Sequence, residues 1–341
     1  MSLGIAGTWR PTSFEWNDIW HSCAYATYFH GGEWAKIWET YSGGTTVPDP
    51  VGIVFSDGTR VVLPFSKQTV LKGYASRWVS SPAGTFGGWI GRSHLTSTHQ
   101  AVLAKWIAAS YPDLIWRLNP YEPLTAAVPG ARVNTDETHC LDLSVGFDEI
   151  YRGWSKGHGS AARKARKARD AGVVIKLAEN EEDWRNYFRV YNASQQRWGA
   201  RATSAYDWSL FEAIFKRASP HVRLWLAIHE RCIVAGALCF YSAAHAVYWH
   251  GAALSDYFRL RPVNLLMQEA IRDACARSIR WFDFNPSGGL EGVKAFKRSF
   301  NAFPLSSNVV TTSSLRMRLL LAAASLLPRK KNEKTNLPVL Q

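Results

Sequence analysis

Apolar residues along the first part of the chain recur first at the spacing of helices and then at that of strands. Trp34, Ile37 and Trp38 stand three and four positions apart, which predicts a helix with one apolar face. Further on, Asp57-Gly58 separates two β-rich runs, and this dipeptide is typical of a hairpin turn. The elements predicted here are helical stretches within 14–38, strands 51–55 and 60–65, a helix near 99–110 and a strand near 114–118.

A similar order of elements returns in the second half of the chain. Pro262 suits the first turn of a long helix, because proline lacks the N–H that this turn leaves unpaired. We interpret the repetition as two α/β halves of similar topology, with a boundary around 141–153. The elements predicted here are helices near 160–171, 182–198, 208–218, 262–278 and 290–300, and strands 173–177, 222–228, 233–241, 246–251, 280–284 and 304–311.

The length of 341 residues exceeds the ~100–200 residues of a typical domain, which agrees with two halves. We therefore predict an N-terminal domain at 1–145, a second domain at 146–312, and a C-terminal helix with a basic tail at 313–341. The five cysteines are scattered and lie in apolar surroundings, which favours reduced, buried thiols. Their spacing with histidines resembles no zinc site, so no metal is expected.

The chain is basic, with 40 Lys+Arg against 27 Asp+Glu and a net charge of +13. Such an excess favours anionic partners, and nucleic acid, phosphorylated metabolites and anionic lipid all remain open. Met1–Pro11 does not resemble a signal peptide, so the protein is expected in the cytoplasm. Arginines and lysines flank the apolar run 319–327, which makes peripheral docking at the inner face of the membrane the alternative to a helix packed on its own domain.

Several weak motifs occur together in an order that resembles one known family. They are Phe86-Gly-Gly-Trp89, the basic segment 161–172, Tyr248-Trp-His-Gly-Ala-Ala253, Pro262-Val-Asn-Leu-Leu266, Trp281-Phe-Asp-Phe284 with Gly288-Gly289, and Gly292 to Phe300. The chain resembles the GNAT acyltransferase fold of the FemAB-like family, which comprises Fem aminoacyl and peptidyl transferases and related bacterial N-acyltransferases. The resemblance implies tandem GNAT-like α/β domains, each a mixed sheet flanked by helices, with the second domain catalytic.

Members of this family transfer an acyl or aminoacyl group from a CoA thioester or a charged tRNA to an amine. The resemblance therefore implies an acyltransferase that uses acyl-CoA and acts on an amine of a sugar, peptide or cell-envelope polysaccharide precursor. Acyl-CoA is a co-substrate here, and no bound cofactor is expected. A transferase that uses aminoacyl-tRNA is the first alternative. The second is a non-catalytic GNAT-like module that binds anionic lipid or RNA through 152–169; DNA is not expected as a partner.

Two positions are the candidates for chemistry. Phe296-Lys297 matches a Phe-Lys pair that lies near the transferred carbonyl in the Fem family, where the lysine can stabilise negative charge on the oxygen. The alternative is that Lys297 lies with Lys294 and Arg298 on the wet face of a short helix. His250 lies on a predicted strand and is a candidate to accept the proton of the amine, with a core histidine as its alternative.

Donor binding is assigned to the turn before the long helix. Arg259, Arg261 and Asn264 lie where a GNAT enzyme holds the pyrophosphate of its donor against a helix N-terminus. The usual CoA fingerprint has glycines at this turn, whereas this sequence has Pro262 and Asn264. That departure suits aminoacyl-tRNA as a donor equally well.

Acceptor binding is assigned to polar residues at three places. Asp283 and Asn285 end a strand beside two glycines and are candidates to orient the acceptor, with turn chemistry as the alternative. Arg197-Trp198-Gly199 resembles a family segment after the first helix of the second domain, which makes Arg197 a candidate partner for a carboxylate or phosphate. Arg163 and Lys164 belong to the basic helix, which is either a phosphate-binding surface or a solvated face.

Overall fold

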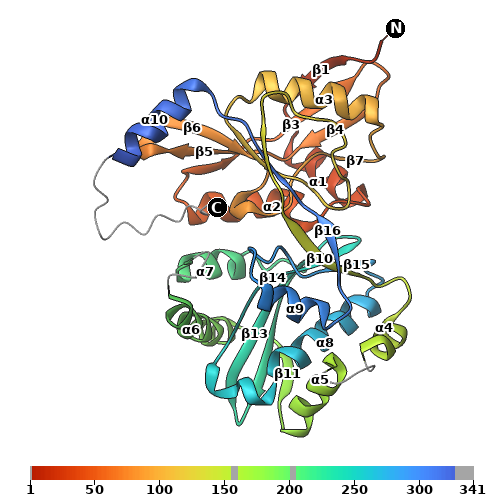
Figure 1. Ribbon diagram of the computed structural model, residues 1–341, viewed down its shortest axis with the longest axis vertical. Helices are drawn as coiled ribbons and strands as arrows, with labels where there is room; N and C mark the ends of the chain where they lie inside the picture. The colour runs from red at the N-terminus through yellow and green to blue at the C-terminus, as the bar shows by residue number, and fades with distance from the viewer. Residues whose placement is uncertain (1, 155–159, 200–204, 327–341) are drawn as a thin grey trace. The chain divides into compact units, whose positions relative to one another are not determined.

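The computed structural model describes residues 2–154, 160–199 and 205–326, and the chain folds into two compact units (Figure 1). The first unit contains Met1–Asp136 and the returning segment from Ser306 onward, and the second contains Glu137–Leu305. Each combines sheets with helices, which confirms the α/β class. The division falls earlier than the boundary predicted at 145–146, because the segment after Glu137 pairs with a strand of the second unit.

The first unit holds two sheets rather than one. Asp57-Gly58 closes the predicted hairpin: the amide of Phe55 donates to the carbonyl of Thr59, and Gly58 has a φ of +88°. One sheet has the strand order β1 (Ile5–Trp9), β3 (Val51–Phe55), β4 (Arg60–Leu63) and β7 (Ile90–Gly91). The other has β2 (Thr46–Pro48), β5 (Ser66–Val70), β6 (Ala75–Val79), β8 (Leu114–Arg117), β17 (Val309–Thr311) and β9 (Arg132–Asn134).

Buried tryptophans form much of the core of the first unit. Trp34, Trp89 and Trp116 are almost completely buried. The indole nitrogens of Trp16 and Trp20 each donate to a backbone carbonyl at 2.8 Å, so their burial leaves no donor unpaired. The helices of this unit are α1 (Ser13–Ser22), η1 (Tyr28–His30), α2 (Gly32–Tyr41), η2 (Leu71–Gly73), η3 (Pro82–Gly84), α3 (Ser97–Ser110) and α10 (Leu315–Leu326).

The second unit is built on one continuous sheet. Its strand order is β11 (Val174–Leu177), β12 (Val222–His229), β13 (Cys232–Tyr241), β14 (His245–Ala253), β15 (Trp281–Asp283), β10 (Glu137–Asp142) and β16 (Phe303–Ser306). Within this sheet β14 and β15 run parallel, whereas β10 and β15 run antiparallel. The helices are α4 (Phe147–Trp154), α5 (Ala161–Asp170), α6 (Glu181–Trp198), α7 (Trp208–Lys216), η5 (Ser255–Leu260), α8 (Pro262–Ala276) and α9 (Glu291–Arg298).

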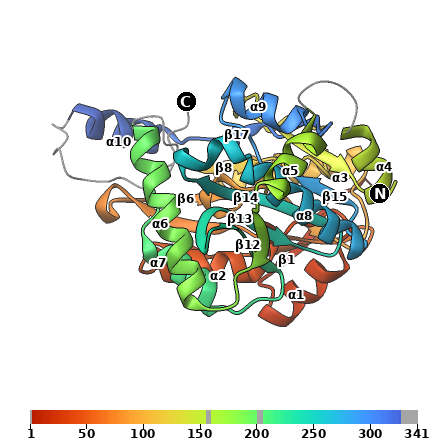
Figure 2. The ribbon, with the colours of Figure 1, turned by 90° about the horizontal axis from the view of Figure 1, so that it is seen from below.

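Helices cover both faces of this sheet. In Figures 1 and 2, α6 and α7 lie on one face, and α5 and α8 lie on the other. Ala161, Ala165 and Ala168 on α5 are completely or almost completely buried, and α5 packs against α8 along this small-residue face. The basic helix thus buries a face of small residues, and its arginines lie exposed on the other sides.

Two parts of the chain differ from the sequence-based prediction. The region 141–153, predicted to contain the boundary, holds the end of β10 and most of α4, and both belong to the second unit. The strand predicted at 304–311 is two strands in different sheets: β16 belongs to the second unit and β17 pairs with β8 and β9 of the first. Among the described residues, no helix is long and apolar enough to cross a membrane.

Candidate active site

All of β15 pairs with the first three residues of β14, and β14 is bulged just beyond that point. The parallel pair runs over His245–Val247 and Trp281–Asp283, after which β15 ends while β14 continues. Leu238 lies opposite His250 and Cys239 opposite Tyr248, so Trp249 is an extra residue in the ladder. A bulge interrupts the hydrogen bonds of a ladder and redirects nearby side chains, and bulges are common beside active sites.

Lys297 is the one residue of α9 that is buried, with 2% of its surface exposed. Its ammonium group donates a hydrogen bond to the backbone carbonyl of Asn285, just after β15. The wet-face alternative therefore does not describe Lys297. It does describe its neighbours, since Lys294 pairs with Glu137 at 3.0 Å and the exposed Arg298 pairs with Glu291.

The turn that receives Lys297 is fixed by a buried carboxylate. Asp283 is fully buried, and its Oδ1 accepts hydrogen bonds from the Thr138 hydroxyl and from the Asn285 amide, both at 2.6 Å. Asn285 has a φ of +61°, a left-handed conformation that asparagine tolerates better than most residues. Its side-chain amide reaches the carbonyl of Trp249 at 3.4 Å, which links the turn to the bulge.

The structure thus brings Lys297, Asp283 and Asn285 together at the end of β15. Phe296 is next to them in α9 and packs against Phe300, with ring centroids 5.2 Å apart. Burying a cation costs several kcal/mol unless hydrogen bonds and opposite charge offset it. Keeping a lysine at this buried position costs folding free energy. Buried charged groups of this kind concentrate at functional sites.

His250 lies next to the bulge among aromatic side chains. Its Nδ1 and the Tyr187 hydroxyl lie 2.7 Å apart, and its ring centroid lies 4.5 Å from that of Tyr191. Burial lowers the pKa of His250 to about 3, so the neutral ring is a weak base near pH 7. This geometry favours the alternative of a histidine that orders the aromatic cluster over that of a proton acceptor.

The N-terminus of α8 carries the residues assigned to the donor. Arg261 precedes the helix with a φ of +63°, and both Arg261 and Arg259 are exposed. Asn264 is 6% exposed and Gln268, one turn further, 1% exposed. The Asn264 side-chain nitrogen and the Gln268 side-chain oxygen have no hydrogen-bond partner among the described residues. Exposed arginines beside a helix N-terminus suit a phosphate-rich donor.

The remaining predicted positions lie apart from the Lys297 cluster. Arg197 donates to the carbonyl of Ala253 at 3.0 Å, and its guanidinium lies 4.7 Å from the Phe258 ring centroid, so it holds the end of β14. Arg163 and Lys164 belong to α5, where Arg163 is exposed and Lys164 partly exposed. These two residues form part of a basic helix surface.

Sequence reasoning missed Thr138, His139 and Ser287. Thr138 and His139 lie on β10, in a segment to which no element was assigned from the sequence, and both are buried. Burial and the charge of Lys297 lower the pKa of His139. The Ser287 hydroxyl, in the loop after β15, is buried with no partner among the described residues. Only the pairing of β10 with β15 brings Thr138 to Asp283, so no local pattern indicates it.

Comparisons with known proteins bear on the domain type and the fold. Residues 155–298 match the family model described as an acetyltransferase (GNAT) domain. None of the curated proteins matches the sequence. Among solved structures, FemX is similar over 92% of this chain and 99% of its own, at 12% identity and a TM-score of 0.70.

Two further structures share the fold. L-PGS from Bacillus licheniformis covers 94% of this chain and 98% of its own, at 12% identity and a TM-score of 0.54. The C-terminal domain of a putative lysylphosphatidylglycerol synthetase from Agrobacterium fabrum covers 92% and 95%, at 12% identity and a TM-score of 0.53. Residues 155–298 therefore match a GNAT acetyltransferase domain, and the fold of the chain is similar to that of FemX.

Proposed function

We propose that this protein moves an acyl group from an acyl-CoA donor to an amine of a sugar, peptide or cell-envelope polysaccharide precursor. The observation that carries the proposal is the buried Lys297, held at the end of β15 beside the bulge of β14, inside a matched GNAT domain. A fixed cation in a site shielded from water stabilises developing negative charge far better than one in solvent.

In this scheme the amine nitrogen of the acceptor attacks the carbonyl carbon of the thioester. The C–N bond forms, negative charge collects on the carbonyl oxygen, and the C–S bond then breaks. The amine loses a proton, and the departing sulfur or water takes it. Lys297 stabilises the charged oxygen, while Asp283 and Asn285 hold the turn that fixes the lysine. The step needs no covalent enzyme intermediate, because the protein acts by positioning and by charge.

Arg259 and Arg261, at the N-terminus of α8, bind the phosphates of the donor in this proposal. Titration calorimetry with acetyl-CoA, a longer acyl-CoA and CoA alone tests that assignment. We expect micromolar binding that weakens at least about tenfold in Arg261→Ala, since a hydrogen bond to a charged group contributes about 1.5–3 kcal/mol. Arg272→Ala is the matched control, because Arg272 lies on the same helix and pairs with Glu269. Absence of binding by every CoA species would contradict an acyl-CoA donor.

One observation favours aminoacyl-tRNA as a second candidate donor. Arg163, Arg166, Lys167 and Arg169 all lie exposed on α5 and form a basic surface suited to a phosphate backbone. RNase treatment separates the two donors in a transfer assay with cell extract as the source of donor. Transfer activity that survives RNase treatment excludes aminoacyl-tRNA as the donor. Activity that disappears excludes acyl-CoA as the sole donor.

A further inference from the structure

Helix α10 is apolar on almost all sides and yet lies largely in solvent. Leu315, Leu319 and Leu321 are 67%, 61% and 47% exposed. A helix that is apolar all round is ordinarily buried in a protein core or in a membrane. An exposed one of this composition therefore needs an apolar environment that the described part of this chain does not supply.

The helix is nevertheless firmly attached at its start. The Asp113 carboxylate accepts hydrogen bonds from the Ser314 amide at 2.7 Å and from the Ser314 hydroxyl at 3.0 Å. The Ser314 hydroxyl in turn accepts from the Met317 amide at 3.1 Å, and Met317 is 6% exposed. The first turn is thus capped and packed, so the exposure of the leucines reflects the position of the helix.

Helical spacing places the apolar and basic side chains in a definite order around α10. Met317 and Leu320 face the β5–β6 hairpin, whereas Leu315 and Leu319 lie on the opposite side. At about 100° per residue, Arg316 and Arg318 flank this outer stripe on either side. An apolar stripe bordered by arginines is the arrangement of helices that lie in the plane of a membrane surface.

The neighbouring hairpin adds aromatic and basic groups to the same surface. Tyr74, just before β6, is 76% exposed, and Lys72 near it is exposed. Neither 66–79 nor 312–326 contains an aspartate or glutamate. The basic residues of the two segments are Lys67, Lys72, Arg77, Arg316 and Arg318. Their charge is complementary to an anionic surface.

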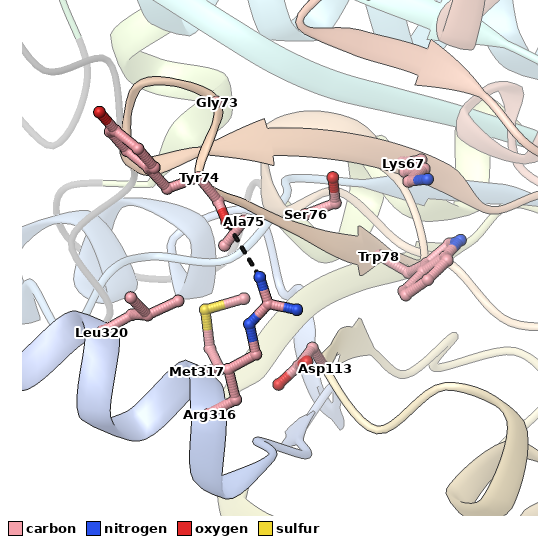
Figure 3. Close-up of a pocket in the computed structure, with 10 residues that line it drawn as sticks. All are labelled: Lys67, Gly73, Tyr74, Ala75, Ser76, Trp78, Asp113, Arg316, Met317 and Leu320. Atoms are coloured by element: carbon pink, nitrogen blue, oxygen red, sulfur yellow. Dashed lines mark hydrogen bonds between the residues drawn. The ribbon is translucent and has the colours of Figure 1, made fainter.

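A pocket of about 290 Å³ lies between the hairpin and α10 (Figure 3). Lys67, Trp78 and Arg316 are among its lining residues, and the Arg316 guanidinium reaches the carbonyl of Tyr74 at 3.5 Å. Asp113 is the one acid in the lining, and both of its oxygens accept from Ser314. The pocket therefore presents two cations toward a space that fits a phosphate group.

We propose that α10 and the β5–β6 hairpin form a docking surface for an anionic phospholipid bilayer. The outer leucines and Tyr74 enter the interfacial region, Arg316 and Arg318 contact headgroups, and the pocket beside Lys67 receives one headgroup phosphate. Burial of apolar area and attraction of lysines and arginines to anionic lipid both stabilise the bound state. The proposal is independent of the proposed transfer reaction, because it uses residues of the first unit only.

Flotation of the intact protein with lipid vesicles tests this surface. We expect binding to vesicles of phosphatidylcholine with phosphatidylglycerol, and none to phosphatidylcholine alone. Arg316→Ala with Arg318→Ala should weaken binding roughly thirtyfold, since each cation near an anionic surface contributes about 1 kcal/mol. Leu315→Glu with Leu319→Glu should abolish it, and added salt should weaken it. Circular dichroism confirms that each variant remains folded.

The matched control removes the same charge elsewhere in the first unit. Arg60 and Arg92 are exposed arginines on or beside the four-stranded sheet, and Arg60→Ala with Arg92→Ala should leave vesicle binding unchanged. An equal loss of vesicle binding in this control would show that binding depends only on net charge, and would overturn the proposal. So would failure of the wild type to bind anionic vesicles, or displacement by millimolar inorganic phosphate alone. A change of oligomeric state in Leu319→Glu without vesicle binding would assign the surface to a second copy instead.

Discussion

Both units of this protein contain buried charged side chains, and Glu122 of the first unit is held differently from Lys297 of the second. In the first unit, the Glu122 carboxylate accepts from Trp89 at 3.3 Å and from the Leu95 amide at 3.2 Å, and it pairs with His94. In the second, the Lys297 ammonium donates to a carbonyl in a left-handed turn at a strand end.

The surroundings of the two charges, rather than their burial, distinguish their roles. Glu122 joins three loop positions of one unit, as a structural carboxylate does. Lys297 lies beside a bulge and an ended strand, inside the matched GNAT domain. We infer that loss of the first charge lowers stability, whereas loss of the second lowers turnover.

The largest effect on stability is expected from Glu122→Ala. It leaves the Trp89 indole N–H and the Leu95 amide buried without an acceptor, which should cost about 3 kcal/mol of unfolding free energy. Chemical denaturation measures this cost, and turnover per folded molecule should remain unchanged. His94→Ala is the matched control, because that side chain is 68% exposed and its loss should cost less than about 1 kcal/mol. Equal costs for the two variants would contradict the account of Glu122.

A smaller effect is expected at the positioning carboxylate of the second unit. Asp283→Asn weakens the two hydrogen bonds that fix Thr138 and the Asn285 turn, so Lys297 is held less well. We expect turnover to fall about tenfold with little change in the affinity for acyl-CoA, which corresponds to about 1.4 kcal/mol. Steady-state kinetics separates kcat from KM. A loss of affinity with unchanged kcat would place Asp283 in donor binding instead.

The smallest effect is the acid sensitivity of one histidine in each unit. Burial lowers the pKa of His30 to about 4 and that of His250 to about 3. The unfolded chain binds these protons near pH 6.5 and the folded chain does not, so stability is retained above about 6.5 and falls as pH decreases. Between about pH 7 and pH 5.5, each histidine should lower the unfolding free energy by about 1 kcal/mol at most. In His250→Gln, the unfolding free energy should depend less steeply on pH than in the wild type. An unchanged pH dependence would exclude a contribution from His250.

Local signals in the sequence were enough to predict most helices and the first hairpin. Pro262 marked the start of α8. Asp57-Gly58 predicted the turn between β3 and β4. The tandem GNAT-like α/β class rested on the order of motifs, and the fold similarity to FemX confirms it.

Long-range pairing was not predictable in this way. β10 enters the sheet between β15 and β16, which are both more than a hundred residues away, so nothing in its own sequence assigns it there. Thr138 therefore escaped notice, although its partner Asp283 was a candidate. Glu122 was missed for the same reason, because its partners come from a loop that precedes it by about thirty residues.

Turnover of Lys297→Met tests the central claim most directly. Thiol release from acyl-CoA in the presence of an amine acceptor is measured for wild type and variant, with donor affinity determined in parallel by calorimetry. Methionine keeps the apolar length of the side chain and removes the charge that stabilises the oxygen. We predict a loss of about 10²- to 10³-fold in turnover with donor binding unchanged. Equal thiol release by the two proteins would contradict a catalytic role for Lys297.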